Sequence, residues 1–414
     1  MAEKGAWFPR RLRNDGERER FYLYGARAAR GFGDGFAAVV LPAYLAEIGF
    51  APFQIGLVAT AALLGSAVLT LAIGFLGPRY QLRSLLMACA LLMILTGLAF
   101  PNFQHFAFLA LIAFIGTINP STGDIGVHVP LEHASLAHAA SDQERTRTFA
   151  RYSLIGALSI AAGALMVGTP DLLVSLGVGK LSAMQLLFYL YAALGLLAAF
   201  FYSRLPRIKT GQITEKPAAL GPSRAIVYRL AALFSLDAFA GGFTVQSLLA
   251  LWLFERFDLT LAAASVFFFW SNVLSAFSYP VAARLGGRFG LINTMVFTHV
   301  PSSLCLIAAS FASSLPLVLT LLLVRSALSQ MDVPTRTSYV MAVVTPAERT
   351  AAASITAVPR SLASSISPAL SGALLSTAFI GLPLVVSGTL KIAYDLALLF
   401  LFRHIKAPEE LKRD

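Results

Sequence analysis

The chain has 414 residues, of which 57% are hydrophobic and 13% are charged, and its formal net charge is +11. Soluble domains carry roughly 25% charged residues, so these proportions exclude a soluble enzyme, a fibrous protein and a disordered chain. The basic residues stand in short runs between apolar stretches rather than along one solvated face, so we expect no nucleic-acid partner. The composition indicates a multi-pass membrane protein in contact with the lipid bilayer.

Apolar stretches of about 20 residues, the length that crosses a bilayer, recur along the chain. We predict about twelve, all helical, because lipid offers free backbone groups no hydrogen-bonding partners. The polar residues 1–20 contain no signal-peptide core, so we expect the first stretch to be a retained span. The stretches cover residues 21–46, 54–77, 84–101, 105–132, 148–169, 183–204, 225–254, 261–283, 292–312, 317–344, 351–377 and 384–404.

Basic residues gather in alternate loops, and the positive-inside rule assigns those loops to the cytoplasm. We therefore expect both termini in the cytoplasm and the protein in the cytoplasmic (inner) membrane. Residues 205–224 are rich in Pro, Gly and charge, which is typical of a linker. The predicted organisation is an N-terminal tail, a six-helix bundle, a central cytoplasmic loop, a second six-helix bundle and a C-terminal tail, over residues 1–20, 21–204, 205–224, 225–404 and 405–414.

The two predicted bundles repeat one another at an offset of roughly 204–209 residues. Asp124-Ile-Gly-Val-His128 corresponds to Asp332-Val-Pro-Thr-Arg336, and Glu144-Arg-Thr to Glu348-Arg-Thr. Arg151 precedes Gly163 by the spacing at which Arg360 precedes Gly372. A duplicated six-helix unit with a two-fold axis along the membrane normal leaves this kind of pattern.

The loop after the second stretch reads Gly74-Phe-Leu-Gly-Pro-Arg79-Tyr-Gln-Leu-Arg83, and its second copy keeps Leu285, Arg288 and Gly290. With the repeated helices, this loop resembles the Gly-x-Leu-x-Asp-Arg-x-Gly-Arg-Lys motif of the major facilitator superfamily. Both copies lack the usual acid. The resemblance covers essentially the whole chain and implies an all-α fold of 12 transmembrane helices in two pseudo-symmetric bundles, with a small-molecule substrate in a central cavity.

Asp34 lies near the middle of the first stretch, with Arg30 one helical turn before it. An ionisable group at this depth costs several kcal/mol. We consider two interpretations: a protonatable carboxylate in the central cavity, or a fixed Arg30–Asp34 ion pair. The resemblance favours the first interpretation slightly, because the first span lines the cavity in that family.

Asp237 and Arg325 are the corresponding central charges of the second half. Asp237 could serve in coupling, or it could pair with Arg229 or with a residue of a neighbouring helix. We expect Arg325 to pair with Asp34 or Asp237, and we keep an anionic substrate as the alternative.

Asp124, His128 and Glu132 follow one another at four-residue spacing on one helix face, near the predicted cytoplasmic end. We interpret them as part of a cytoplasmic gate that closes through arginine pairs. A metal site or proton relay is the alternative. The expected partners and their counterparts in the second half are Arg79, Arg145, Arg151, Arg288, Asp332, Arg336 and Arg360.

Other polar residues within the spans have ordinary explanations as well as functional ones. Lys391 and Asp395 are four residues apart and are expected to neutralise each other. His299 is expected to be a satisfied core histidine. Possible substrate contacts are Asn119, Gln246, Trp252 and Asn272.

The predicted function is that of a monomeric secondary active transporter, not an enzyme. We expect no metal and no cofactor. The leading hypothesis is proton-coupled efflux of a drug, metabolite or toxic ion by alternating access. The alternatives are proton-coupled uptake, transport of an organic or inorganic anion, and a non-transporting receptor or scaffold on a transporter fold.

Overall fold

A computed structural model describes residues 15–76, 79–121, 126–139, 142–207, 220–345 and 348–403. Its first half contains α1 (Asp15–Glu47), α2 (Pro52–Leu76), α3 (Leu82–Asn102), α4 (Phe106–Ile115), α5 (His128–Ala139), α6 (Asp142–Leu165), η2 (Met166–Gly168), α7 (Thr169–Ser175) and α8 (Lys180–Ser203). Its second half contains α9 (Arg224–Gly242), α10 (Gln246–Phe257), α11 (Leu261–Phe289), α12 (Leu291–Phe311), α13 (Leu315–Ser329), α14 (Asp332–Val343), α15 (Arg349–Leu375) and α16 (Leu382–Phe402).

All regular structure in the described residues is helical, and nine stretches among them are long and apolar enough to cross a membrane. The predicted first and eleventh spans, α1 and α15, are long but more polar, and the predicted fourth span contributes only the short apolar α4. Buried arginines and an aspartate on α1, and many serines on α15, lower their hydropathy. Arg27, Arg30 and Asp34 of α1 and Ser365, Ser367 and Ser371 of α15 are buried inside the protein.

Three predicted spans are interrupted rather than continuous. The predicted helix 105–132 ends as α4 at Ile115, and α5 begins only at His128. The predicted helix 225–254 divides into α9 and α10, and the predicted helix 317–344 into α13 and α14. Interrupted helices inside a membrane are tolerated where the freed backbone groups are buried in protein or line a cavity.

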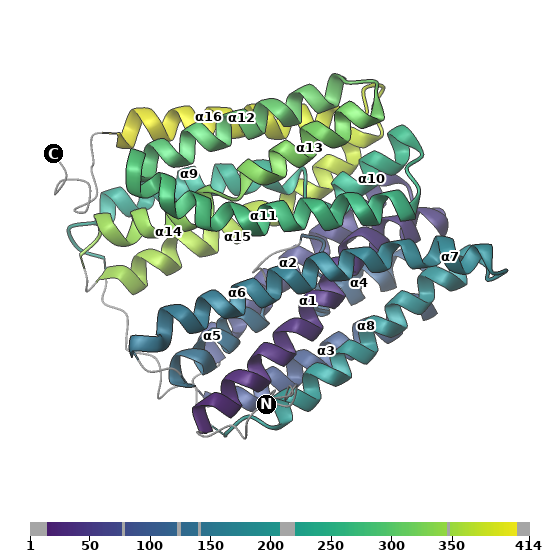
Figure 1. The fold of residues 1–414 in the computed structure, drawn as a ribbon, viewed down its shortest axis with the longest axis horizontal. Helices are drawn as coiled ribbons and strands as arrows, with labels where there is room; N and C mark the ends of the chain where they lie inside the picture. Colours follow the sequence, from purple (N-terminus) through teal and green to yellow (C-terminus); the bar gives the residue numbers. More distant parts are fainter. Residues whose placement is uncertain are drawn as a thin grey trace, which may run out of the picture.

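The helices form two bundles, α1–α8 and α9–α16, which lie side by side (Figure 1). We call the end where α1 begins and α16 ends the terminal end, and the opposite end the far end. Each bundle has its own apolar core at the terminal end, built around Tyr152 and Tyr202 in the first half and around Tyr339 and Tyr394 in the second.

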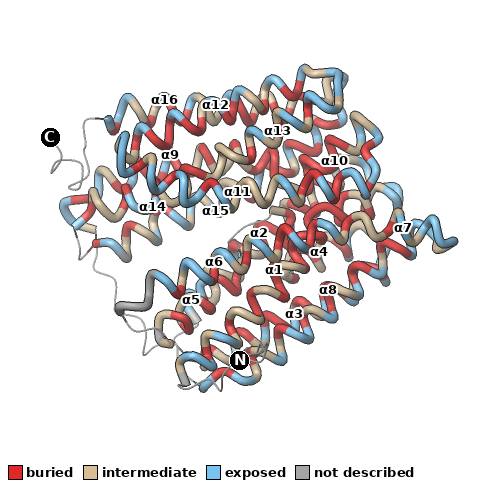
Figure 2. The backbone as a smooth tube through the Cα atoms, in the orientation of Figure 1, coloured by how far each residue is buried: buried red, intermediate tan, exposed pale blue. Residues whose placement is uncertain are grey.

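At the far end the two bundles share one core, which joins Phe36 to Leu45 of α1 with Leu248 to Leu253 of α10. Figure 2 shows buried residues concentrated where α1 and α10 meet. The hydrogen bonds between described residues of the two halves also avoid the terminal end: they run from Ser247 N to Pro120 O (3.0 Å), from Ala369 N to Thr60 Oγ1 (2.9 Å) and from Ala262 N to Asp171 Oδ2 (2.8 Å). The structure is therefore closed at the far end.

Candidate functional site

The first half contains a buried cluster around Arg30 and Glu132. Glu132 is fully buried on α5, and its carboxylate forms an ion pair with Arg30 of α1. Tyr202 of α8 donates to Glu132 Oε1 at 2.5 Å and accepts from Arg30 Nε at 3.0 Å, and Tyr152 of α6 donates to the same carboxylate. The pair is thus satisfied by hydrogen bonds from several helices, as a buried ion pair must be.

Asp34 is buried one turn further along α1, and no Arg, Lys or His among the described residues lies within ion-pair distance of it. Arg30 is held by Glu132, so the expected Arg30–Asp34 ion pair does not form. The side chain of Asp34 lies beside the hydroxyl of Tyr191, which donates to Thr117 O at 3.1 Å. Arg30 and Arg27 act on Asp34 electrostatically, but among the described residues its buried carboxylate forms no ion pair.

Asp34 and Arg30 line a pocket between α1, α2 and the interruption that separates α4 from α5. His128 contributes an imidazole that is 4% exposed and whose Nε2 has no hydrogen-bond partner. Asn119 adds an amide, and the remaining wall is largely apolar. The lining residues are Arg30, Asp34, Ala62, Leu63, Ser66, Leu69, Met93, Gly116, Thr117, Ile118, Asn119, Pro120, Gly126, Val127, His128 and Tyr191.

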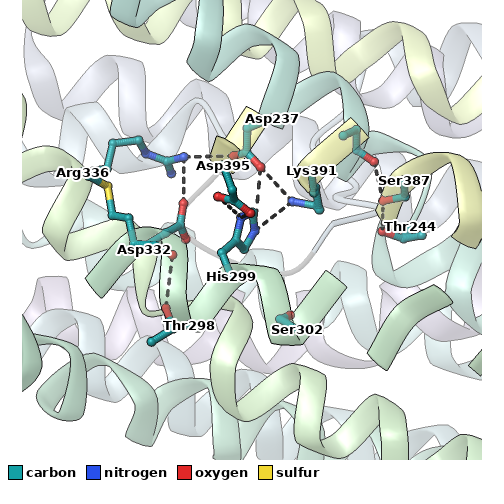
Figure 3. Close-up of polar contacts among 12 residues, drawn as sticks. Asp237, Thr244, Thr298, His299, Ser302, Asp332, Arg336, Ser387, Lys391 and Asp395 are labelled. Carbon is teal, nitrogen blue, oxygen red and sulfur yellow. Dashed lines mark hydrogen bonds and ion pairs between the residues drawn. The ribbon is translucent and has the colours of Figure 1, made fainter. Parts of the chain in front are cut away.

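The second half contains a larger buried cluster, in which Asp237 of α9 joins two other helices (Figure 3). Its Oδ2 accepts from Arg336 Nη1 of α14 at 3.1 Å, and its Oδ1 accepts from Lys391 Nζ of α16 at 2.8 Å. Arg336 also pairs with Asp332, one turn earlier on α14, at 3.0 Å.

His299 of α12 extends this cluster. Its Nδ1 lies 3.0 Å from Asp395 Oδ1, and its Nε2 lies 3.3 Å from Lys391 Nζ. Lys391 and Asp395 therefore do not neutralise each other, contrary to the sequence-based expectation. Each has its partner on another helix, and the cluster ties together α9, α12, α14 and α16.

The expected pairing of Arg325 with Asp34 or Asp237 is wrong. Arg325 is half-buried on α13, and its guanidinium forms no ion pair with any carboxylate in the part of the chain that the structure describes. Asp237 instead takes Arg336 and Lys391, and Arg229 is exposed.

The expected arginine partners of the first-half gate are not found either. Arg79 and Arg151 are exposed, whereas His128 and Glu132 are buried, and Glu132 pairs with Arg30. The interruption after α4 is the reason, because α5 places Glu132 inside the bundle instead of at the end of one long helix. Asp124 and the side chain of Arg145 lie outside the described residues.

In the second half, Asp332 and Arg336 do lie together, as expected for the equivalent cluster. Arg360 on α15 is half-buried and makes no ion pair with a described acid, and Arg288 is exposed, with its guanidinium 5.3 Å from the Phe289 ring centroid. None of these contacts joins one half to the other.

The predicted substrate contacts lie in different places. Asn119 lines the pocket. Gln246 begins α10 and is half-buried, and Asn272 on α11 is half-buried with its Nδ2 unbonded. Trp252 is fully buried in the far-end core, with its ring 5.7 Å from that of Phe257, so it does not face a cavity.

Sequence reasoning did not identify the tyrosines of the first-half cluster or the central place of His299. Tyr191 stands among apolar and aromatic residues, and Tyr152 and Tyr202 belong to no motif, so nothing in the sequence indicates their polar contacts with other helices. A signal did exist for His299, since a histidine within an apolar span is rare.

Comparisons with known proteins agree with this architecture. The sequence profile of the Major Facilitator Superfamily matches residues 23–271, which is more than half of the chain. An uncharacterised membrane protein of Saccharomyces cerevisiae is 23% identical over 409 residues, covering 90% of this chain and 91% of the relative.

Solved structures show the same fold. The nucleoside transporter NupG superposes with a TM-score of 0.71 at 14% identity, over 93% of this chain and 99% of that one. The D-xylose–proton symporter superposes with a TM-score of 0.71 at 15% identity, over 94% of this chain and 98% of that one.

The all-helical double bundle and its buried intramembrane charges define a multi-pass membrane protein of the transporter type. The chain belongs to the major facilitator superfamily. The sequence-based prediction of the family and of its fold is thereby confirmed.

Proposed function

We propose that this protein is a secondary active transporter that exports a small solute in exchange for protons, with Asp34 as the proton-binding residue. Asp34 carries the proposal because it is buried in a pocket without an ion-pair partner among the described residues. A carboxylate in such a place changes its protonation when its surroundings change. The Arg30–Glu132 pair next to it keeps the adjacent guanidinium engaged.

Alternating access is supported by the distribution of contacts between the halves. The shared core and the hydrogen bonds between described residues of the two halves occur away from the terminal end, where each half keeps its own core. Rocking of one bundle against the other would open the far end and close the terminal end around a central site. The apolar wall of the pocket, with Leu63, Leu69 and Met93, favours an amphiphilic solute and hence export.

The test uses the purified protein in liposomes with an imposed pH gradient and a pH-sensitive dye. Pools of drugs, metabolites and oxyanions are added to the wild type and to Asp34→Asn. We expect proton movement with one pool in the wild type and its loss in the variant. Movement of that solute against the direction of proton flow identifies export, and movement in the same direction identifies uptake.

Glu47→Gln is the matched control, because it removes a carboxylate from the exposed far end of the same helix, where Glu47 pairs with Lys180 at 2.7 Å. This variant is expected to retain proton-coupled transport. Retention of coupling in Asp34→Asn would refute the role of Asp34.

One observation favours a second candidate, the transport of an anion. Arg325 presents a half-buried guanidinium without an ion-pair partner among the described residues, and such a group attracts carboxylate or phosphate. If the oxyanion pool alone drives proton movement and Arg325→Gln abolishes it, the anion candidate is correct.

A further inference from the structure

The pocket at Asp34 contains a second buried polar group, the imidazole of His128, to which the coupling role of Asp34 assigns no task. His128 is the first residue of α5, and it is 4% exposed. Its Nε2 lies on the pocket wall and has no hydrogen-bond partner among the described residues. A buried polar atom without a partner is costly, so this atom indicates a contact with a group that enters the pocket.

Contacts with two other helices fix the orientation of this ring. It stacks on the ring of Tyr202 on α8, with centroids 6.5 Å apart and an angle of 21° between the planes. The backbone oxygen of Cys89 on α3 accepts a hydrogen bond from the ring. Because Nε2 has no partner, the donating atom is Nδ1. In a neutral imidazole with its hydrogen on Nδ1, Nε2 carries the lone pair and can only accept.

The charges that act on this ring are positive. Among the described residues, they are the guanidiniums of Arg30 and Arg27. Both oppose a further positive charge at this place, whether it is on the ring or on a bound ligand. An ammonium group is therefore disfavoured as the donor to Nε2, and an uncharged donor is not.

A ligand in this pocket also meets the carboxylate of Asp34, which in its charged form is a second acceptor. Two donors of the pocket wall are already engaged. Arg30 pairs with Glu132, and the hydroxyl of Tyr191 donates to a backbone oxygen at 3.1 Å. An anion without an O–H or N–H group would thus offer no hydrogen to Nε2 and would lie close to another carboxylate.

The space in the pocket limits the size of the group that reaches Nε2. The cavity measures about 20 Å³, which is room for roughly one water-sized group. A hydroxyl or an N–H group fits this space, whereas the rest of a solute remains outside it in this conformation. Water has the same size and is also a neutral donor, so it is the competing occupant.

We propose that His128 is a specificity-determining residue and that the transported solute places an uncharged hydroxyl or N–H group on its Nε2. The inference rests on the proposed function, in which the pocket at Asp34 receives the solute. It names the substrate class as an amphiphilic molecule with a neutral hydrogen-bond donor. Organic cations are disfavoured at this position by Arg27 and Arg30, and anions without a hydrogen are disfavoured by the lone pair of Nε2.

Nitrogen-15 NMR of the histidine-labelled full-length protein in lipid bilayers tests this contact without any transport. His128→Asn identifies the His128 signals among those of the 6 histidines. The four probes share an aromatic body and differ in their polar group: benzyl alcohol, benzyl methyl ether, benzylammonium and benzoate. We expect benzyl alcohol alone to shift the Nε2 signal upfield in a saturable way, as when an imidazole lone pair accepts a hydrogen bond.

Two other histidines provide the controls. His105→Gln removes an exposed histidine just before α4 and should leave the shift as in the wild type. The signals of His299 in the second half, identified with His299→Asn, should stay in place with every probe. An Nε2 signal that benzyl alcohol does not move overturns the proposal, and so does a site that water holds permanently. An equal shift with benzyl methyl ether or benzylammonium also contradicts it, because the contact would not depend on a neutral donor.

Transport in liposomes separates this inference from the coupling role of Asp34. His128→Phe keeps an aromatic ring for the contact with Tyr202 but removes Nε2. We expect it to raise the half-saturating concentration of the proton-coupled solute roughly 2- to 10-fold, which corresponds to the loss of one hydrogen bond, and to lower the maximal rate by a smaller factor. Asp34→Asn should abolish coupling instead.

The two proposals fail in different ways. If the wild type moves no protons with any solute, the proposed function fails, whereas the NMR result does not depend on transport. If transport is coupled and His128→Phe leaves the half-saturating concentration unchanged, only the inference on His128 is refuted. Size-exclusion chromatography verifies that each variant is folded, and the wild-type NMR decides the question if His128→Phe does not fold.

Discussion

Buried charges in this protein find their partners on other helices rather than on their own. Arg30 of α1 pairs with Glu132 of α5, and Asp237 of α9 pairs with Lys391 of α16. Among the ion pairs of the described residues, only Asp332–Arg336 joins residues one turn apart on the same helix. Each cross-helix pair fixes the relative position of two helices, because an ion separated from its partner inside the bundle is costly.

Asp237→Asn is expected to lower the free energy of unfolding by about 3 kcal/mol, within the range for breaking a buried ion pair. Arg336 retains Asp332 in this variant, so the uncompensated charge is Lys391. Adding Lys391→Met should therefore recover a large part of the loss. Thermal unfolding of the variants in detergent measures both effects, and a double variant less stable than Asp237→Asn would contradict this charge balance.

At the level of the helices, the interruptions place side chains where a continuous helix could not. α5 begins at His128 after the chain has left α4 at Ile115, and α14 begins at Asp332 after a turn at Gln330 and Met331. Ser247 at the α9–α10 interruption donates its N–H to Pro120 O at the α4–α5 interruption, so the two broken spans satisfy each other across the halves. This is the condition under which irregular backbone is stable inside a membrane.

The start of α15 is joined to the segment before α9 by the carboxylate of Glu348. Glu348 precedes α15, and its carboxylate accepts from the hydroxyls of Thr345 at 2.6 Å and Ser223 at 2.7 Å and from the N–H of Gly221. These hydrogen bonds lower the pKa of Glu348 from 4.5 to about 2. They connect the loop between α14 and α15 to the residues just before α9.

The depressed pKa of Glu348 predicts a pH-dependent contribution to stability. The contribution is complete above pH 4.5, where the carboxylate is charged in the folded and the unfolded chain alike, and it is lost as the pH falls through about 2. The difference in melting temperature between the wild type and Glu348→Gln should therefore shrink over this interval. Ser223→Ala removes one donor and should move the change to higher pH; a difference independent of pH would contradict the assignment.

For the whole molecule, the arrangement of apolar cores determines how the halves can move. One core at the far end contains residues of both halves, while the terminal end has a separate core in each half. Separation at the far end must therefore expose apolar surface and break hydrogen bonds such as that from Ala369 N to Thr60. Closure at the terminal end has to compensate, which couples the two ends energetically.

A disulfide across the far end is expected to stop transport. A Cβ at Gly168 would lie 3.6 Å from the Ser265 Cβ, and disulfides join Cβ atoms about 3.5–4.5 Å apart. Gly168→Cys combined with Ser265→Cys should cross-link the halves on oxidation, abolish solute transport in liposomes and regain it on reduction. The single variants under the same oxidant are the controls, and full transport by the cross-linked protein would refute opening at this interface.

The amino-acid sequence determined the features that depend on the bilayer as a solvent. Apolar stretches long enough to cross it, a polar linker in the middle of the chain and repeated loop motifs were sufficient for the helical double bundle and its family. The sequence also predicts that Asp34 lies near the middle of its span, because a rise of about 1.5 Å per residue converts position in a helix into depth.

Only the tertiary structure decided which charge compensates which. Sequence spacing favoured Arg30 with Asp34 and Lys391 with Asp395, since residues four apart share a helix face. The observed partners are Glu132 for Arg30, Asp237 for Lys391 and His299 for Asp395. These partners depend on where the helices α4, α9 and α13 end within their spans and on which helices then face each other. Both are set by packing between helices, about which the spacing of residues along one helix carries no information.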